Sequence, residues 1–507
     1  MRFYFSFVSV FLIIFSIFII PDFSYSLSVK EEKVIGREVL NQIKRAYPVV
    51  TDPYIVKYIN DIGQVVVDNS DNRLFDFSFH IIKNKEYNAF AVPGGYIFVH
   101  TGLIAAMEEE CELVGILAHE AAHVTSRHIA QQVEDSKKIS LGTLAGLAAG
   151  IALGMSGGDP DAVMGLIAGT QALGQSAMLS YSREHEREAD KKGLIYLTKA
   201  GYSPEGLLEI LKTMRSKEYF TEEHAPVYMR THPGTKERIE YISSFIDNNK
   251  ELVETCTRGE KGVFSRFNKV KIKITALYEE KNFALKRFEE MEKDPQKKPG
   301  AYYGLALLAM KNEEYEKSKY YFLKALKYNA LDSELLFDYG KTLFYKGDFK
   351  SALQKFNTIK AHGVDFLEIE VFRGRAYLEL ENYERAKELF DILTLKHPEI
   401  LYLWYYNAVA NEKSGYSGLS HYYLGRYHEL RNDNDLTVFH YKKAASLLDG
   451  KEKSEVDERL KAFLNRGKKK KKKSEKEDGE EKAQFRLIKK SIRLNSLPDG
   501  VFGNLII

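Results

Sequence analysis

Two histidines and a glutamate stand in a spacing that suits metal-assisted hydrolysis, at His119, Glu120 and His123. On an α-helix, residues four apart lie above one another on one face, so both imidazoles can reach the same metal ion. Zinc held in this way lowers the pKa of a water molecule towards neutrality, and a neighbouring carboxylate can take the proton of that water. The pattern therefore predicts His119 and His123 as metal ligands and Glu120 as a general base.

The residues around this motif predict that it lies on a helix. Residues 111–132 contain no proline, and their apolar side chains recur at helical spacing. Such a pattern is typical of a helix buried in a domain core. A core helix whose histidines are satisfied by ordinary neighbours is the alternative interpretation, because short motifs also occur by chance.

A second polar segment farther along the chain supplies candidates for a third metal ligand. Residues 181–192 read YSREHEREADKK and predict another helix. The arrangement resembles that of gluzincins, zinc peptidases whose third ligand is a glutamate on a second helix, with an aspartate one turn later. The resemblance implies Glu186 as the ligand. It also implies that Asp190 accepts a hydrogen bond from the free ring nitrogen of a ligating histidine, for which we expect His119.

Other interpretations of this second segment stay open. Glu184 and Glu188 are candidates in neighbouring registers, and His185 is a further possible ligand. A charged helix that faces solvent is the common origin of such a run of polar residues.

Four motifs in order resemble the BepA-like periplasmic metallopeptidases, which belong to the wider group that includes HtpX and the CaaX prenyl endopeptidases. The motifs are NAFAVPGGYIFVHTGL (88–103), HEAAHVTSRH (119–128), YSREHEREAD (181–190) and HPGTKER (232–238). The resemblance implies one Zn2+ per chain and peptide-bond hydrolysis. It also implies substrates among outer-membrane proteins and the machinery that inserts them.

The last of these motifs has three interpretations. By resemblance, His232 occupies the open zinc position as a fourth ligand and holds the enzyme latent. Alternatively, His232 or Arg238 donates a hydrogen bond to the oxyanion of the reaction, so we group Arg238 with Glu120 and Asp190 as residues that serve the chemistry. The third interpretation is a turn followed by a helix with Thr235 as its N-cap and Arg238 on the surface.

The glycine-marked motif predicts a strand that could bind substrate. Pro93, Gly94 and Gly95 form a turn signal, and the β-branched and aromatic residues from Tyr96 onward favour a strand. An edge strand beside the zinc can pair with an extended polypeptide. Gly94, Gly95, Tyr96 and Ile97 are therefore candidates for substrate binding, and an ordinary hairpin strand is the alternative.

The first residues predict export from the cytoplasm. Arg2 precedes an apolar run from 3 to 20, with small residues before a cleavage site expected after Ser26. We expect residues 1–26 to be a signal peptide and the mature chain to be periplasmic; an uncleaved membrane anchor is the alternative. Two cysteines are too few to define a disulfide framework.

An apolar segment separates the predicted metal-binding helices. Residues 139–180 are rich in glycine and alanine. We interpret them as a helical hairpin packed on the domain core, as a lid in peripheral contact with a membrane, or as a membrane-inserted hairpin.

The C-terminal half repeats with a period of 34 residues, which is the period of tetratricopeptide repeats. Small residues recur at one position and phenylalanines at another: Ala306, Gly340, Gly374, Ala408; Phe322, Phe356, Phe390. Each unit buries its apolar face only by stacking on its neighbours. We expect these repeats over 268–450, with 269–295 as a degenerate leading unit, and a concave surface that binds a protein partner.

The whole chain is predicted to be α+β and mostly α. A gluzincin-type metallopeptidase domain over 27–255 precedes the α-helical tetratricopeptide solenoid, and a charged, disordered tail is expected over 451–507. A net charge of +3 with 29% charged residues gives no reason to expect a nucleic-acid partner.

Two functions fit this organisation. The first is a zinc metalloendopeptidase of the cell envelope that cleaves misfolded or stalled polypeptides, while its repeats recruit envelope assembly proteins. The second is a periplasmic chaperone or assembly scaffold with a mostly latent zinc site. Glu120 favours the first, because a scaffold has no need of a general base.

Overall fold

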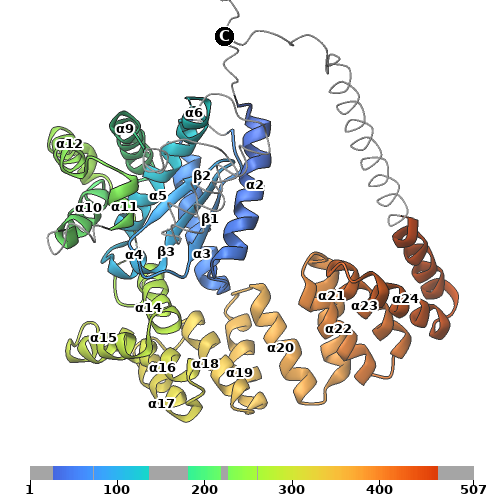
Figure 1. Cartoon of the computed structure of the whole chain (residues 1–507). Coiled ribbons are helices and arrows are strands. Elements are labelled where there is room, and N and C mark those ends of the chain that lie inside the picture. The colour runs from blue at the N-terminus through green and yellow to red at the C-terminus, as the bar shows by residue number, and fades with distance from the viewer. Residues whose placement is uncertain (1–26, 72–73, 136–180, 219–225, 260, 466–507) are drawn as a thin grey trace, which may run out of the picture. The chain divides into compact units, whose positions relative to one another are not determined.

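The computed structural model of the chain describes residues 27–71, 74–135, 181–218, 226–259 and 261–465 (Figure 1). The predicted signal peptide, the apolar segment 139–180 and residues 466–507 of the predicted tail lie outside the described residues.

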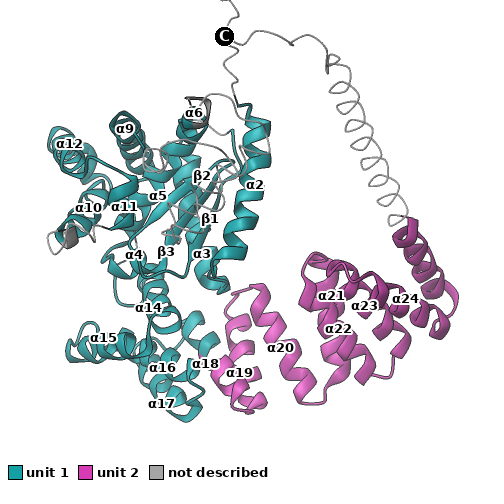
Figure 2. Ribbon diagram, viewed as in Figure 1, with its two compact units in different colours: residues 1–338 teal, residues 339–507 magenta. Residues whose placement is uncertain are grey.

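The chain divides into two compact units, residues 1–338 and residues 339–507 (Figure 2). The division falls within helix α18 (Ser333–Tyr345), so the predicted repeat region contributes to both units. The domain boundaries drawn from the sequence stay predictions.

A three-stranded sheet forms the β part of the first unit. Its order is β1 (Ser78–Ile82), β3 (Tyr96–His100), β2 (Ala89–Val92), with β1 parallel and β2 antiparallel to β3. The tight turn between β2 and β3 requires glycine, because Gly94 and Gly95 have φ angles of 86° and 94°.

The helices of the predicted peptidase domain (residues 27–255, called the peptidase part below) surround this sheet, and their starts follow local capping signals. Ser28 forms a capping box at the start of α2, and Asp52 accepts a hydrogen bond from the Ile55 amide at the start of α3. The helices are α2 (Val29–Ala46), α3 (Pro53–Asp68), α4 (Thr101–Ala106), α5 (Glu110–Thr125), α6 (His128–Asp135), α9 (Arg183–Lys199), α10 (Glu205–Glu218), α11 (Val227–Thr231), α12 (Thr235–Asn248) and α13 (Lys250–Glu254).

Helix α5 is buried on nearly all sides, as the apolar residues around its motif predict. Glycines let its neighbours approach closely. A Cβ atom on Gly193 of α9 would lie 3.2 Å from the backbone of His119, and one on Gly206 of α10 would lie 2.3 Å from the carbonyl of Cys111. The close contact at Gly193 places α9 against the predicted metal-binding stretch of α5.

Helix α14 (Arg266–Tyr278) joins the peptidase part to the repeats within the first unit. Its side chains Phe267, Val270 and Ile274 belong to the same hydrophobic core as α3 and α5. The helices α15 (Lys281–Lys293), α16 (Lys298–Lys311) and α17 (Tyr315–Leu326) follow. Part of the peptidase core is therefore supplied from beyond residue 255.

The second unit consists of helical repeats whose packing follows the 34-residue pattern. A Cβ atom on Gly340 would lie 2.5 Å from the ring of Phe356, and one on Gly374 would lie 2.6 Å from the ring of Phe390. The small residue of one helix thus receives the aromatic ring of the next. The helices are α19 (Phe349–Ala361), α20 (Leu367–Glu379), α21 (Tyr383–Lys396), α22 (Leu401–Lys413), α23 (Ser417–Leu430) and α24 (Asn434–Leu447).

The predicted fold class is confirmed: a mostly helical chain with a small sheet and a repeat region. The start of the predicted tail differs from expectation, since residues 450–465 are helical. Val456 is buried against Tyr441 and Ala444, and this apolar contact extends the helical stack. Among the helices of the described residues, none combines the length and apolar character needed to cross a membrane.

A buried ionic cluster ties the peptidase part to the repeats inside the first unit. The ammonium of Lys273 (α14) lies 3.2 Å from Asp52 and 3.0 Å from Asp338, and it also pairs with Glu334. The hydroxyl of Tyr303 donates to Asp338 at 2.7 Å. One ammonium thus faces three carboxylates away from water, and burial raises the pKa of Glu334 to about 7.

The raised pKa predicts a pH-dependent stability. Glu334 binds a proton more tightly in the folded chain than in the unfolded chain, so its contribution is fully present below its ordinary pKa of 4.5 and is lost as the pH rises through about 7. In Glu334→Gln, which keeps an acceptor for Lys273, the melting temperature should fall less between about pH 5 and about pH 8 than in the wild type. If the melting temperatures of the two proteins instead change equally with pH, Glu334 is ionised throughout this pH range and the prediction is wrong.

Candidate metal centre

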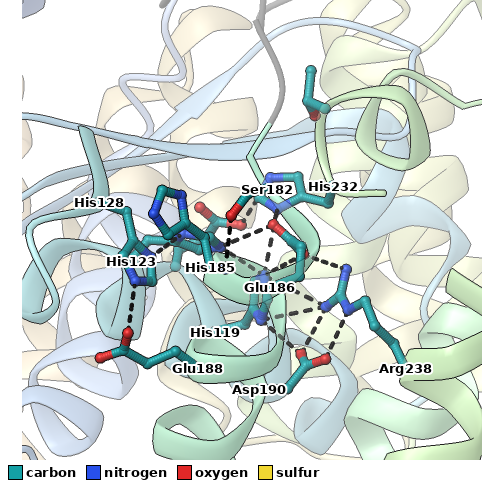
Figure 3. Close-up of polar contacts among 12 residues, drawn as sticks. His119, His123, His128, Ser182, His185, Glu186, Glu188, Asp190, His232 and Arg238 are labelled. Atoms are coloured by element: carbon teal, nitrogen blue, oxygen red, sulfur yellow. Dashed lines mark hydrogen bonds and ion pairs between the residues drawn. The ribbon is translucent and has the colours of Figure 1, made fainter. Parts of the chain in front are cut away.

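Three elements of the first unit bring polar side chains together in a buried cluster (Figure 3). Helix α5 supplies His119, Glu120 and His123, and helix α9 supplies Glu186. His232 directly follows the short helix α11. All five residues are at most 1% exposed.

Four of these side chains present metal-binding atoms to one another. The Nε2 atoms of His119 and His123 lie 3.0 Å apart and are 3.4 and 3.3 Å from the carboxylate oxygens of Glu186. His232 Nδ1 lies 3.0 Å from Glu186 and 3.4 Å from His119 Nε2. Within the described part of the chain, this is the one group of three or more such residues whose ligand atoms all lie within 4.8 Å of one another.

These separations fit a tetrahedral metal ion. Ligand atoms roughly 2.0–2.1 Å from a tetrahedral zinc lie roughly 3.3 Å from one another. Imidazole nitrogens and carboxylate oxygens are also the donors that zinc accepts. The cluster can therefore hold a metal ion through His119, His123 and Glu186, with His232 in the fourth position.

Asp190 and Arg238 support the cluster from the side. His119 Nδ1 lies 2.9 Å from Asp190, which fixes the orientation of the ring and turns its Nε2 towards the other ligands. Arg238 Nε and Nη2 each donate to Asp190 at 2.8 Å, and Nη1 lies 2.8 Å from Glu186. Although burial opposes ionisation, His232 and Arg238 hold the pKa of Glu186 well below its ordinary range.

This geometry corrects two predictions about the HPGTKER motif. Arg238 is 4% exposed and its guanidinium is engaged by two carboxylates, so it positions Asp190 and Glu186 and is not presented to a reacting oxyanion. Thr235 is the first residue of α12 and not its cap. The N-cap is Gly234, whose φ of 81° is readily adopted by glycine alone.

Glu120 differs from the other buried carboxylates of the centre. Neither of its oxygens has a hydrogen-bond partner within the described structure, and the nearest charged neighbour is His232 Nε2 at 3.5 Å. Burial raises the pKa of Glu120, while His232 and His119 oppose this rise. A carboxylate that is kept unpaired beside a metal site is suited to accept a proton.

Aromatic and imidazole rings pack around the ligands. The Tyr181 ring stacks on His123 with centroids 3.8 Å apart, and the Tyr228 ring stacks on His232 at 4.2 Å. His128 Nδ1 lies 2.9 Å from His123 Nδ1, so His128 contacts one of the candidate ligands. Sequence reasoning missed these two tyrosines, because a tyrosine that packs on a ligand has the same sequence pattern as any core tyrosine.

The alternative candidates on α9 point elsewhere. The Glu188 carboxylate pairs with Lys192 at 2.7 Å and accepts from Ser126 at 3.0 Å. Glu184 is exposed. His185 stacks on His128 with ring centroids 4.4 Å apart and does not belong to the cluster.

The predicted substrate-binding strand is not at a sheet edge, which corrects that assignment. Tyr96 and Ile97 lie on β3, which pairs with β1 on one side and β2 on the other, so its backbone groups are already used. Gly94 and Gly95 belong to the buried turn before it. Of the described strands next to α5, it is β2 that lies at an edge.

Two histidines from one helix, a glutamate from a second and an unpaired glutamate beside them define an HExxH metallopeptidase domain. In agreement, residues 56–246 match peptidase family M48, and residues 303–363 and 373–415 match the tetratricopeptide repeat. Residues 56–246 are thus similar to M48 peptidases, and the residues that follow are similar to tetratricopeptide repeats.

Several curated proteases are similar to this chain in sequence. A putative beta-barrel assembly-enhancing protease of Vibrio cholerae is 28% identical over 298 residues, 58% of this chain and 60% of that protein. The beta-barrel assembly-enhancing protease of Escherichia coli K12 is 31% identical over 224 residues, 43% of this chain and 45% of that protein. The mitochondrial metalloendopeptidase OMA1 of Schizosaccharomyces pombe is 27% identical over 198 residues, 39% of this chain and 55% of that protein. The chain spans about half the length of the curated relatives it matches.

The cluster predicts which acid holds the metal. Glu186→Ala should lower the divalent metal bound per chain sharply, as should His119→Ala and His123→Ala, because each removes a donor within the cluster. Glu184→Ala, two residues away on the same helix but exposed, is the matched control and should keep its metal. Metal content after dialysis measures this. If Glu188→Ala lost its metal while Glu186→Ala kept a full complement, Glu188 would be the ligand in place of Glu186.

Proposed function

We propose that this protein is a zinc-dependent endopeptidase of the cell envelope that cleaves misfolded or stalled polypeptides. The observation that carries this proposal is the unpaired carboxylate of Glu120 beside three ligand donors, His119, His123 and Glu186. A metal site that served structure alone would have no use for a buried, unpaired carboxylate, which costs stability.

The residues divide the chemistry among them. Bound zinc supplies a Lewis acid that polarises a peptide carbonyl and makes water a better nucleophile. Glu120 takes the proton from the attacking water and can return it to the leaving amine. Asp190 keeps the Nδ1 proton on His119, so that Nε2 is free to bind metal, and Arg238 holds Asp190 in place.

The names of the relatives support an envelope role. The bacterial relatives are called beta-barrel assembly-enhancing proteases. The apolar run at residues 3–20 is the sequence feature that agrees with export. We therefore place the protein in the periplasm, with outer-membrane proteins as its substrates.

The repeats suit recruitment of other proteins. Tyr345, Tyr402 and Tyr405 in the second unit are 47%, 40% and 45% exposed. Tyrosine rings offer a large contact area with a hydrogen-bonding tip, which is why they are frequent at protein interfaces. Envelope assembly proteins are the partners we propose for this surface.

A chaperone or scaffold with a latent site is the second candidate. It is favoured by one observation: His232 adds a fourth donor to the cluster, and the cluster is closed to solvent. A zinc site with four protein ligands has structural character, whereas a catalytic site keeps one position open.

Glu120→Gln separates these candidates. The substitution keeps the shape of the side chain and breaks no hydrogen bond within the described structure, so bound zinc and folding should be unchanged. Casein cleavage should fall by roughly a hundred- to ten-thousand-fold. Glu184→Gln, an exposed acid, should cleave like the wild type, and a chelator should abolish cleavage by both active proteins. Undiminished cleavage by Glu120→Gln would exclude this base, and a wild type without zinc-dependent cleavage would favour the scaffold.

His232→Ala decides whether that residue closes the site. If His232 is a fourth ligand that displaces water, its removal opens the position, and cleavage of casein and of the chain itself should rise. His185→Ala, a nearby histidine outside the cluster, is the control and should leave cleavage unchanged. Cleavage lowered by roughly a hundred- to a thousand-fold at full zinc content would instead make His232 a donor to the oxyanion.

A further inference from the structure

A cavity of about 540 Å3 lies in the first unit, and its lining includes no residue of the metal cluster. One wall is the segment 83–87 between β1 and β2 together with the start of α4. The other wall is formed by the end of α14 and by α15. The cavity therefore lies where the peptidase part meets the first helices that follow it. Its volume is in the range of ordinary ligand sites.

The cavity carries basic groups without acidic partners. Lys83, Lys85 and Arg287 line it, and none of the three forms an ion pair within the described structure. Arg287 donates to the carbonyl of Ala105 at 2.9 Å. Lys311 lies near the rim, where its ammonium donates to the carbonyl of Glu279 at 3.4 Å. Burial and the charge of Lys83 together lower the pKa of Lys311.

Two carboxylates in the wall do not neutralise these groups. Glu279 and Glu280 line the cavity, against the three basic residues of the lining and Lys311 beside them. Burial raises the pKa of Glu279, although Arg287 and Lys311 oppose this rise. The cavity as a whole thus favours an anionic occupant.

Aromatic side chains form the apolar part of the lining. Phe283 on α15 is 53% exposed, which is unusual for a ring beside a cavity, and Tyr87 and Tyr278 are only partly buried. An exposed ring next to unpaired cations suits an acidic side chain whose neighbour in the sequence is apolar. An extended polypeptide turns neighbouring side chains to opposite sides, so one can face Lys83 and Lys85 while the next faces Phe283 on the other wall.

The cavity is also connected to the metal centre. The carbonyl of Tyr87, in the cavity wall, accepts a hydrogen bond from the amide of Tyr228 at 3.2 Å. The ring of Tyr228 stacks on His232 with centroids 4.2 Å apart and planes at 16°. A shift of the segment 83–87 therefore reaches the fourth position of the metal cluster through one hydrogen bond and one ring contact.

We propose that this cavity is a second polypeptide-binding site, which holds an acidic residue and its apolar neighbour, and that its occupancy is transmitted to His232 through Tyr87 and Tyr228. The binding site stands independently of the peptidase activity. The transmission rests on the proposed function.

The first experiment measures binding alone. The probe is a fluorescein-labelled peptide, Gly-Asp-Phe-Glu-Phe-Gly, titrated by fluorescence anisotropy against full-length Glu120→Gln protein, in which cleavage does not interfere. Its counterpart with Asn and Gln in place of the two acids is the control ligand. The acidic peptide should bind about tenfold more tightly or better, because hydrogen bonds to charged groups are stronger than those to neutral groups. Equal binding of both peptides, or no binding of either, overturns the proposal.

Substitutions then locate the site. Lys83→Glu should weaken binding of the acidic peptide by about tenfold or more, and Arg287→Gln by several-fold. Phe283→Ser should weaken binding of both peptides. Lys286→Glu is the matched control, since Lys286 is an exposed neighbour of Arg287 on α15 that does not line the cavity, and it should bind within about twofold of the parent protein. Binding unaffected by Lys83→Glu and Arg287→Gln would place the peptide elsewhere and overturn the proposal.

A second experiment tests the transmission in the otherwise wild-type enzyme. Unlabelled acidic peptide should change the rate of casein cleavage at least about twofold, and Lys83→Glu should abolish this response while keeping the basal rate. If the peptide binds but leaves cleavage unchanged, the transmission is wrong and the binding site stands. If the wild type cleaves nothing, the proposed peptidase function fails, and the anisotropy data still decide on the site.

Discussion

Charge compensation around two buried carboxylates is the constraint on which the metal centre depends. Glu186 and Asp190 are at most 1% exposed, and an isolated carboxylate at such a position would take up a proton. Arg238 prevents this by contacting both acids, and the ligand histidines contribute further hydrogen bonds. The centre is therefore preformed. Arg238, on helix α12, pairs with the ionised Glu186 and so holds α9 in position.

Backbone packing places these charges where they can meet. Gly193, about two turns after Glu186 on the same face of α9, lets α9 lie against α5 at His119. The core that fixes α5 continues into α14, whose Phe267 and Ile274 pack in it. The peptidase part and the first repeat helices of the first unit therefore fold as one body, and the buried pair of Lys273 with Asp338 reinforces their contact. A chain cut between them would expose apolar surface from both sides.

Local sequence determined the ligands but not their surroundings. The spacing of His119 and His123 could be read directly, because helical periodicity turns both to one face. Among the acids of α9, the resemblance to gluzincins singled out Glu186 and Asp190, and periodicity did not. The topology of the sheet could not be predicted in this way, because the order of strands depends on pairings between residues far apart in the sequence. Tyr96 proved to lie on the central strand. The partner of Arg238 was also beyond local reasoning, because Asp190 lies 48 residues away. The stacking of Tyr181 on His123 likewise joins residues far apart in the sequence, whereas Tyr228 stacks on His232 from one helical turn away.

The closed metal cluster requires that something move before a polypeptide can reach it. His119, His123 and Glu186 lie on long helices that belong to the core, and displacing them would break the packing of the whole unit. His232 follows a five-residue helix, α11, whose backbone is bonded to the segment before β2 through Tyr228 and to Tyr181 through Thr231. Tyr228 and Met229 of this helix are buried in the same core as α5 and α9. Because α11 is much shorter than α5 or α9, a shift of α11 disturbs less of this packing than a shift of either metal-binding helix.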